Sequence, residues 1–470
     1  MSELLSEQEV SQIIRRFEQE NDLFSLKIDG WSAWRLLRFW VSMQLIIHPQ
    51  APRPASDKRK RLLRGLQEMP VYFFPKRAQY LLDTSSSLRI EKENGLYKDV
   101  FFDDLSLSLG SCFKLERVNS EAFHALNRQA LVKSDLTATP LELLTGLLNR
   151  LMRPRPQIKE IARHLSDCIQ SGLGLAVSAE RISRELHYFY WGKRIYRNLL
   201  KKVRPRAVLI SNTNEFAMLA AARELGIPSF EMQHGIFSRN HPDALPAEAR
   251  PYKEILLIPD RMLLFGEHWR QELAAGGFYD RELLPVGSVR MDHYRWQRAA
   301  SPLDGGERPL QVVLTTQGLA VAEMIEFMRS FMDKAGCDLQ LTIKLHPVSD
   351  PSKAPYLQVF GADRRVRILL GSEMPSTFEL LSQADLHVSI ASACHYDALG
   401  LGVPTIVLAL PGHTVVENLV QAGHAALART PQELADLVCA ARDRRVLPEV
   451  SENYFKPGAL ENIRHAITQE

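Results

Sequence analysis

The sequence predicts an α/β protein built from two doubly wound domains, each with a parallel sheet between layers of helices. Its 470 residues exceed the size at which a single hydrophobic core stops growing, so at least two domains are expected. From Pro205 onward, short apolar runs alternate with amphipathic stretches, as strands and helices do around a parallel sheet. The Pro- and Gly-rich stretch Ser301–Pro309 is the expected boundary between the domains.

The first half predicts a helical, basic extension over residues 1–65 and a first domain over residues 66–300. Apolar residues at helical spacing predict a helical insertion over about 140–200. Gly95 is expected in a turn, and further helices are expected over 28–47, over 215–225 and from His268 onward. The strands expected in this half are 71–74, 112–118, 207–211, 229–232, 255–258, 262–265 and 284–286.

The second half predicts a doubly wound domain over residues 301–455, followed by a C-terminal helix within residues 456–470. Ligands of such sheets bind beyond the carboxyl ends of the strands. Two domains of this kind are expected to face each other across a cleft. The clearest helix is 321–334, and the expected strands are 311–315, 340–344, 366–370, 386–390 and 405–408.

The composition argues against several classes of protein. Lys and Arg number 58 against 55 Asp and Glu, and this balance argues against a general nucleic-acid binder. The five cysteines are odd in number and form no CxxC pair, which favours reduced thiols over a disulfide frame or a zinc site. The acidic N-terminus and the lack of an apolar run of roughly 18 residues predict a cytoplasmic protein.

Residues 28–64 have two interpretations. The Trp-rich helical pattern and the basic run after it, Lys58–Arg64, resemble a surface-seeking helix that rests on anionic lipid at the inner face of the cytoplasmic membrane. The interpretation that we favour is that Trp31, Trp34 and Trp40 pack on the body of the protein, while the charges are solvated.

One motif with candidate chemistry follows the expected strand 386–390. Ser389 and Ser392 lie where this strand gives way to a helix, and Ser392 is the expected N-cap. The free backbone N–H groups of that helix, from Ala393 onward, and the helix dipole together favour a phosphate. Any capped helix after a strand looks the same, so a purely structural role is the alternative.

A second motif, Lys344-Leu345-His346-Pro347, ends another strand of the same domain. Lys344 and His346 are two residues apart, so they point to the same side of the strand. Pro347 turns the chain away and leaves both side chains at the carboxyl edge, within reach of one phosphate or diphosphate. A structural hydrogen bond is the alternative role for His346.

A third motif, Gln233-His234-Gly235, follows the expected strand 229–232 in the first domain. Because imidazole titrates near neutral pH, His234 is a candidate general base if it faces the cleft. Alternatively, His234 bonds a backbone carbonyl and shapes the turn.

Together with Gly287–Asp292 and Gly402-Val403-Pro404, these motifs resemble bacterial GT-B enzymes that assemble capsule, O-antigen and teichoic acid. That group includes polysialyltransferases, Kdo-type capsule transferases and CDP-glycerol glycerophosphotransferases. The resemblance covers about residues 205–425 and, more weakly, 28–38 and 71–104. It implies the GT-B fold, with two Rossmann-like domains and a nucleotide-sugar donor bound by the second.

The resemblance also implies roles for particular residues. It assigns His346, Ser389 and Ser392 to the donor phosphate, and Asp397 stands where these families usually carry a glutamate in the following helix. The His-Gly histidine of the glycerophosphotransferases corresponds to His234.

The general base stays open between three residues. The acidic-acidic-Gly motif of the polysialyltransferases has no clear match, so Glu215 and Asp243 are alternatives to His234. No Asp-x-Asp motif occurs. The expected reaction is therefore an inverting transfer that uses neither a metal ion nor another cofactor.

The expected function is transfer of a sugar from a nucleotide-activated donor to a bacterial surface polysaccharide or glycolipid. A CMP-linked nonulosonic acid or Kdo is the first choice of donor. Two alternatives remain: a sugar-nucleotide epimerase of the same fold, which acts without an acceptor, and a non-catalytic scaffold of a polysaccharide assembly complex.

Overall fold

The computed structural model describes residues 7–46, 58–118, 129–212, 214–300, 308–441 and 444–469. The chain divides into two compact units. Unit 1 contains the described residues up to Leu264, Trp269–Pro285 and the residues from Leu460 onward. Unit 2 contains Phe265–His268 and Val286–Ala459. Most of the expected boundary stretch Ser301–Pro309 lies outside the described residues.

Unit 1 is built on a parallel sheet of seven strands in the order β11-β10-β9-β8-β3-β6-β7. Nearly all residues of its central strands are buried, as in a sheet that helices cover on both faces. Two short antiparallel pairs lie outside this sheet: β1 (Lys27–Ile28) with β2 (Trp31–Ser32), and β4 (Arg89–Glu93) with β5 (Leu96–Asp99). The strands of the main sheet are β3 Tyr80–Ser85, β6 Cys112–Arg117, β7 Leu136–Thr137, β8 Ala207–Ile210, β9 Ser229–Met232, β10 Arg261–Leu264 and β11 Leu283–Pro285.

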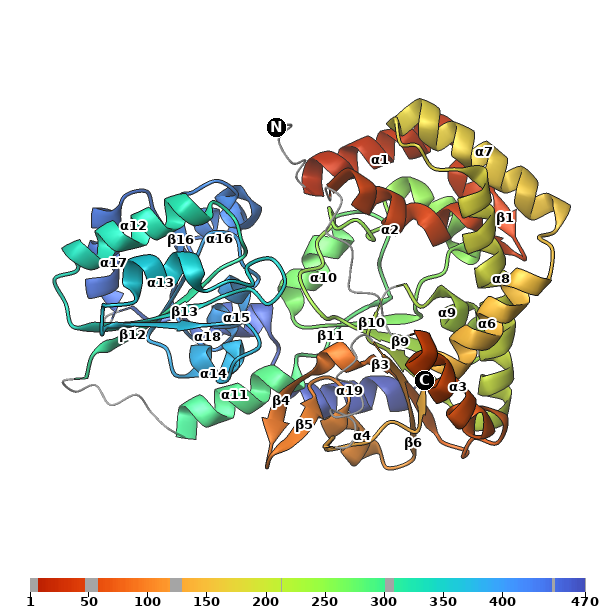
Figure 1. Ribbon diagram of the computed structural model, residues 1–470, viewed down its shortest axis with the longest axis horizontal. Helices are drawn as coiled ribbons and strands as arrows, with labels where there is room; N and C mark the ends of the chain where they lie inside the picture. The colour runs from red at the N-terminus through yellow and green to blue at the C-terminus, as the bar shows by residue number, and fades with distance from the viewer. Residues whose placement is uncertain are drawn as a thin grey trace. The chain divides into compact units, whose positions relative to one another are not determined.

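The helical insertion predicted over about 140–200 is present as α6, α7 and α8, which lie together along one side of unit 1, with α1 and α2 near α7 (Figure 1). Helix α8 begins after Ser178, whose side chain accepts a hydrogen bond from the Arg181 N–H. The helices are α1 Glu7–Asn21, α2 Ala33–Ile46, α3 Lys58–Phe73, α4 Asp103–Leu109, α6 Thr139–Leu151, α7 Pro156–Leu173, α8 Ala179–Val203, α9 Phe216–Glu224, α10 Glu267–Ala274 and α19 Ala459–Thr468, with 3₁₀ turns η1 Leu23–Ser25, η2 Ser86–Leu88 and η3 Ala247–Ile255.

Unit 2 is built on a parallel sheet of six strands in the order β14-β13-β12-β15-β16-β17. The five predicted strands are present to within one residue: β12 Leu310–Thr315, β13 Leu339–Lys344, β14 Val366–Leu369, β15 Leu386–Ser389 and β16 Thr405–Leu408. Strand β17, Ala426–Ala428, was not predicted. The helices are α11 Val289–Ala300, α12 Val321–Lys334, α13 Ala354–Phe360, α14 Thr377–Ser382, α15 Cys394–Gly400, α16 Glu417–Gln421, α17 Pro431–Cys439 and α18 Pro448–Tyr454, with a 3₁₀ turn η4 His413–Val416.

In each sheet the strand order reverses at one pair of neighbouring strands. In unit 1 the chain runs from β3 outward through β6 and β7, then from β8 outward on the other side, so the pair is β3 and β8. In unit 2 the pair is β12 and β15. Open α/β sheets bind ligands at the carboxyl ends of such a pair. The fold therefore defines one candidate binding edge in each unit.

The strand predicted at residues 71–74 is wrong, because this segment is the end of helix α3. The Phe74 N–H donates to the Pro70 carbonyl at 2.9 Å, which is the helical pattern. Helix α3 packs closely on α6 at Gly65, where a Cβ atom would lie 2.1 Å from Leu143 Cδ1. A short apolar run at the end of a packed helix looks like a strand when only the run is considered.

The strand predicted at residues 255–258 is also wrong. The 3₁₀ turn η3 ends at Ile255, and the chain then continues without a ladder partner. Its carbonyl groups are paired with side chains instead: Arg223 donates to the Leu256 and Ile258 carbonyls, and Arg35 donates to the Leu257 carbonyl. Buried backbone acceptors need partners, and here two guanidinium groups supply them.

The Trp-rich segment packs on the protein, as the favoured interpretation expects, but its expectation of solvated charges is wrong for Arg64, which is buried. Trp34 is fully buried and Trp31 is 8% exposed. The Arg181 guanidinium carbon lies 4.5 Å from the centre of the Trp40 ring. The helix predicted from residue 28 begins only at Ala33, because the β1–β2 hairpin precedes it. None of the helices among the described residues has the length and apolarity to cross a membrane.

The expectation of five reduced thiols is wrong for one pair. Cys337 and Cys439 form a disulfide with their Cα atoms 5.6 Å apart, although 102 residues separate them in sequence. Cys112, Cys168 and Cys394 are free. Wide sequence spacing hid a pair that the packing of α12 and α17 brings together.

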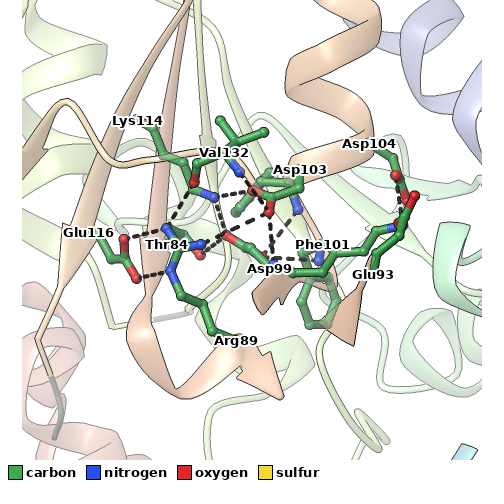
Figure 2. Close-up of polar contacts among 12 residues, drawn as sticks. Thr84, Arg89, Glu93, Asp99, Phe101, Asp103, Asp104, Lys114, Glu116 and Val132 are labelled. Carbon is green, nitrogen blue, oxygen red and sulfur yellow. Dashed lines mark hydrogen bonds and ion pairs between the residues drawn. The ribbon is translucent and has the colours of Figure 1, made fainter. Parts of the chain in front are cut away.

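A buried charged network fixes the β4–β5 hairpin and α4 to strand β6 (Figure 2). Arg89 forms two hydrogen bonds with the Glu116 carboxylate, at 2.7 and 2.8 Å. Lys114 contacts the carboxylates of Asp99, at 2.9 Å, and Asp103. All five side chains are at most 1% exposed. Burial raises the pKa of Asp103, against the attraction of Lys114.

In the Gly287–Asp292 motif, position 287 must be glycine because of the backbone conformation there. Its φ is +100°, and a Cβ atom there would lie 2.2 Å from the Lys456 carbonyl oxygen. We expect Gly287→Ala to destabilise the protein by about 1–3 kcal/mol, because it adds backbone strain and a clash with a main-chain atom. Thermal unfolding measures this, with Gly146→Ala as the control, since a Cβ at Gly146 meets nothing within 4 Å. Equal melting temperatures for the two variants would contradict the assignment.

Candidate functional site

The unit 1 binding edge carries a cluster of polar and charged side chains from two strand ends, the connection between β8 and α9, and helix α8. Asp83 lies near the end of β3, and Arg117 is the last residue of β6. Glu215 immediately precedes α9 in the connection after β8, and Tyr196 comes from α8. The Ser211 N–H and hydroxyl both donate to the Asp83 carbonyl, at 3.2 and 3.3 Å, which ties the connection after β8 to β3.

Arg117 is the centre of this cluster. Its Nη2 donates to Asp83 Oδ2 at 3.0 Å and to the Tyr196 hydroxyl at 3.2 Å, and it forms an ion pair with Glu215. Among the described residues, Arg117 Nε and Asp83 Oδ1 are buried without a hydrogen-bond partner. One guanidinium therefore faces two carboxylates, with hydrogen-bonding capacity left over.

The electrostatics of the cluster favour a bound proton. Burial and the nearby charges of Asp83 and Glu142 together raise the pKa of Glu215 to about 8, against the attraction of Arg117. Burial also raises the pKa of Asp83. A single guanidinium does not compensate two buried carboxylates, so at neutral pH the pair retains a proton. A carboxyl that titrates near the working pH is suited to general acid–base chemistry.

Glu215 and Arg117 line a cavity of about 320 Å³. Its lining combines aromatic and aliphatic walls with carboxyl groups, and it contains one guanidinium against three carboxyls. The polar and aromatic lining residues are Arg117, Glu142, Thr145, Glu185, Asn214, Glu215, Tyr188, Phe189, Tyr196 and Phe216. Apolar concavities with a few converging polar groups are the usual form of a small-molecule site.

His234 lies beyond the end of β9, at the same carboxyl edge of the sheet but in a separate small pocket. It shares this pocket with Glu231, Phe237 and His241. The residue is exposed by its accessible area, and the desolvation that the surrounding protein causes lowers the pKa of His234. Its side chain therefore reaches solvent as a neutral imidazole at neutral pH.

Asp243, the third candidate base, is held in a buried ion pair. Arg35 Nη1 lies 2.5 Å from Asp243 Oδ1, and the Asp243 side chain is 1% exposed. Arg38, also on α2, donates hydrogen bonds to the Pro242 carbonyl and to the Glu18 carboxylate. The two arginines that interrupt the pattern of residues 28–47 thus anchor the loop after β9 to α2, and Asp243 takes part in that anchoring.

In unit 2, Lys344 is the last residue of β13, and its ammonium group points into the protein. Its Nζ donates to the Leu370 carbonyl at 2.9 Å, to the Pro375 carbonyl at 3.1 Å and to the Glu373 carbonyl. Burial lowers its pKa. Three acceptors use the three protons of an ammonium group, so Lys344 ties residues 370–375 to the sheet.

His346 has its ring orientation fixed by its own turn. The Nδ1 atom accepts hydrogen bonds from the backbone N–H groups of Val348, at 3.2 Å, and Ser349, at 2.9 Å. Burial lowers the pKa of His346. With Nδ1 as the acceptor, the neutral ring carries its proton on Nε2, which is then a donor. Pro347 is exposed beside it.

Strand β12 lies between the two unit 2 motifs and connects them. The Ser389 hydroxyl donates to the Thr315 carbonyl at 2.7 Å, and the His346 N–H donates to Thr316 Oγ1 at 3.3 Å. Neighbouring strands lie about 4.8 Å apart, so the two motifs are about 10 Å apart across the edge.

The prediction that Ser392 caps the next helix is wrong. Helix α15 begins at Cys394, its N-cap residue is Ala393, and no side chain caps it. Ser392 is buried, and its hydroxyl accepts a hydrogen bond from the Cys394 N–H at 3.2 Å. Ala393 is exposed at the start of the helix. The two serines therefore shape the turn before the helix.

Asp397, on α15, is partly buried. Burial raises its pKa to about 7, against the attraction of Arg290. The Arg290 guanidinium carbon lies 3.7 Å from the centre of the Phe378 ring. A second carboxyl that titrates near neutral pH thus lies in unit 2. Among the described residues, no group of three His, Cys, Asp or Glu side chains is arranged to hold a metal ion.

Sequence reasoning missed Arg117, Asp83, Tyr196 and the Thr315–Thr316 pair. Arg117 and Asp83 each end or nearly end a strand, and an ionisable residue at such a position is a usable signal. Strand β3 itself was not predicted, so Asp83 had no context. Tyr196 lies in a 25-residue helix, and nothing in the pattern of α8 distinguishes it from a core tyrosine.

Two Rossmann-like units, each with a parallel doubly wound sheet, make this chain an α/β protein of the GT-B fold. A UDP-GlcNAc 2-epimerase from Neisseria meningitidis, solved with UDP-GlcNAc bound, is similar with a TM-score of 0.50 at 15% identity, over 83% of this chain and 100% of that one. A Listeria monocytogenes protein proposed to be a UDP-N-acetylglucosamine 2-epimerase has a TM-score of 0.50 at 14% identity, over 83% and 96%. MurG of Acinetobacter baumannii has a TM-score of 0.47 at 14% identity, over 84% and 100%.

No protein-family model matches this chain. No protein of curated function matches it in sequence.

Proposed function

We propose that this protein is a glycosyltransferase that moves a sugar from a nucleotide-activated donor, bound at the β12–β15 edge, to an acceptor hydroxyl held in the β3–β8 cavity. The observation that carries the proposal is the Glu215–Arg117 cavity. It combines a concave site, a strand-order reversal and a carboxyl whose pKa is about 8. The donor edge is supported by the Nε2–H of His346 and by the exposed position of Ala393 at the start of α15.

The lining of the cavity favours a neutral, polyhydroxylated acceptor. Three carboxyls against one guanidinium repel an anionic ligand, while carboxylates and an amide bond hydroxyl groups well. The rings of Tyr188, Phe189 and Phe216 offer apolar faces for the C–H side of a sugar. The acceptor is thus proposed to be a neutral sugar of a bacterial surface polysaccharide or glycolipid.

The proposed step is an inverting displacement without a metal ion. The acceptor oxygen forms a bond to the anomeric carbon as the bond from that carbon to the donor phosphate breaks. The acceptor proton moves to the Glu215 carboxylate, and the phosphate leaves with the bonding electron pair. His346 donates a hydrogen bond to the developing charge on the phosphate. Arg117 orients the carboxylate and limits the rise of its pKa.

The nucleotide is tested first by thermal unfolding with CMP, CDP, UDP and GDP. A nucleotide that binds only the native state stabilises it by about 2.7 kcal/mol at 100 times its Kd. We expect one of the four to raise the melting temperature, with CMP as first choice, and His346→Ala to abolish that rise. His293→Ala, a partly buried histidine on α11, is the control and should keep it. No rise with any nucleotide would contradict the proposal and favour a scaffold.

An epimerase is the second candidate, because two solved structures of similar fold are an epimerase and a protein proposed to be one. The two functions differ in the need for an acceptor. Incubation with the sugar form of the stabilising nucleotide alone should leave a transferase donor unchanged apart from slow hydrolysis. Conversion of the donor to its epimer, detected by NMR, would overturn the transferase proposal.

A further inference from the structure

Six large apolar side chains on and beside helices α3 and α6 face solvent. On α3 they are Leu62, Leu63 and Leu66, which are 49%, 59% and 55% exposed. On α6 and directly after it they are Leu147, Leu151 and Met152, which are 53%, 68% and 48% exposed. Single exposed leucines are ordinary, whereas a group of this size on two neighbouring helices indicates a contact surface. We call these six residues the α3–α6 surface.

The two helices are antiparallel neighbours, which brings the six residues together. A Cβ at Gly65 would lie within 3.3 Å of both Leu143 and Thr139, so the helices touch there. Further along α3, Glu68 Oε2 accepts a hydrogen bond from the Thr137 N–H at 2.9 Å, just before α6 begins. The start of α3 therefore lies beside the second half of α6, and Figure 1 shows the two helices alongside each other.

The charge around this surface has one sign. The sequence 147–155 contains three arginines, Arg150, Arg153 and Arg155, all of them exposed, and no Asp or Glu. Helix α3 begins with four consecutive Lys and Arg in the sequence, whereas Arg64 further along it is buried. Arg150 and Arg153 are exposed beside the leucines, and Leu151 lies between them in sequence. A second copy of this chain would bring like charges together. An anionic partner with an apolar interior suits both features.

We propose that the α3–α6 surface docks on an anionic lipid bilayer, with its leucines at the depth of the headgroups and its basic residues against the lipid phosphates. This moves the expected lipid contact away from the tryptophans of residues 28–47, which are packed on the protein. The proposal goes beyond the transfer reaction and does not depend on it. If both hold, the docking brings unit 1 to a lipid-linked acceptor.

The test is co-sedimentation of the full chain with vesicles. We expect binding to vesicles of phosphatidylcholine mixed with the anionic lipid phosphatidylglycerol and little binding to vesicles of pure phosphatidylcholine. Leu62→Glu/Leu151→Glu should weaken binding by at least about tenfold, and Arg150→Gln/Arg153→Gln by about fivefold per residue. Raising the salt concentration should weaken the wild type in the same direction.

Leu107→Glu is the matched control, because Leu107 is a 65% exposed leucine on α4 of the same unit, and it should leave binding unchanged. Circular dichroism melting confirms that each variant folds. Equal binding to neutral and anionic vesicles would overturn the proposal, as would wild-type binding by both double variants. Concentration-dependent dimerisation that Leu62→Glu/Leu151→Glu abolishes, without vesicle binding, would overturn it in favour of self-association.

Discussion

Replacing Glu215 by glutamine is expected to lower kcat for sugar transfer by about 100- to 10,000-fold, the usual contribution of a positioned general base. Glutamine keeps the size and one acceptor oxygen beside Arg117, so the ion-paired partner Asp83 and the cavity shape are retained. The measurement is release of the nucleotide from its sugar donor in the presence of acceptor. Glu185→Gln, an exposed carboxyl of the same cavity, is the control and should affect KM more than kcat.

The pH dependence separates the candidate bases. With Glu215 as the base, kcat/KM should rise with pH up to a limb near 8, because only the ionised carboxylate accepts the proton. The pKa of His234 is lowered from 6.5, so with His234 as the base kcat/KM would instead rise at a pH below 6.5. That rise would persist in Glu215→Gln and disappear in His234→Asn.

The raised pKa of Glu215 can also be tested without substrate, through the pH dependence of the free energy of unfolding. Its pKa is raised from 4.5 to about 8 on folding, so the native state binds a proton that the unfolded state releases between these values. The stability that this group contributes is therefore complete below pH 4.5 and is lost as the pH rises through 8. The slope is at most about 1.4 kcal/mol per pH unit. Urea unfolding across this range should show the slope in the wild type and lose it in Glu215→Gln.

Arg89→Met is expected to lower the free energy of unfolding by about 3–5 kcal/mol, because it leaves the Glu116 carboxylate buried without its guanidinium partner (Figure 2). The double variant Arg89→Met/Glu116→Leu should recover most of this loss, because it leaves neither a guanidinium nor a carboxylate buried without a partner. Urea unfolding at pH 7 measures both. Arg329→Met, which breaks an exposed pair with Glu326, is the control and should have little effect. A single variant as stable as the wild type would show that Glu116 finds water or another partner.

The secondary-structure predictions succeeded where the pattern of neighbouring residues alone decides the structure, and they failed where distant residues decide it. In unit 2 the strands are short apolar runs between turn residues, and both the runs and helix α12 were predicted to within one residue. In unit 1 the same rule failed at residues 71–74 and 255–258. One is the end of a packed helix, and the other pairs its carbonyls with Arg35 and Arg223. The residues that contact these two segments are far from them in the sequence, so the local pattern of apolar residues cannot indicate these contacts.

For the candidate site too, some features could be predicted from the sequence and others are visible only in the structure. Periodicity and strand-end position are local properties, and they were enough to predict the α/β class, the two doubly wound domains and the strand ends near which Glu215, His234, His346 and Ser389 lie. The GT-B fold was implied by the resemblance of the motifs. Which of these groups contact one another could be read only from the folded chain. It placed Arg117 and Asp83 against Glu215. It directed Lys344 to three carbonyls and locked Asp243 onto Arg35. The pKa and availability of an ionisable group depend on burial and charged neighbours, and those come from residues far apart in the chain.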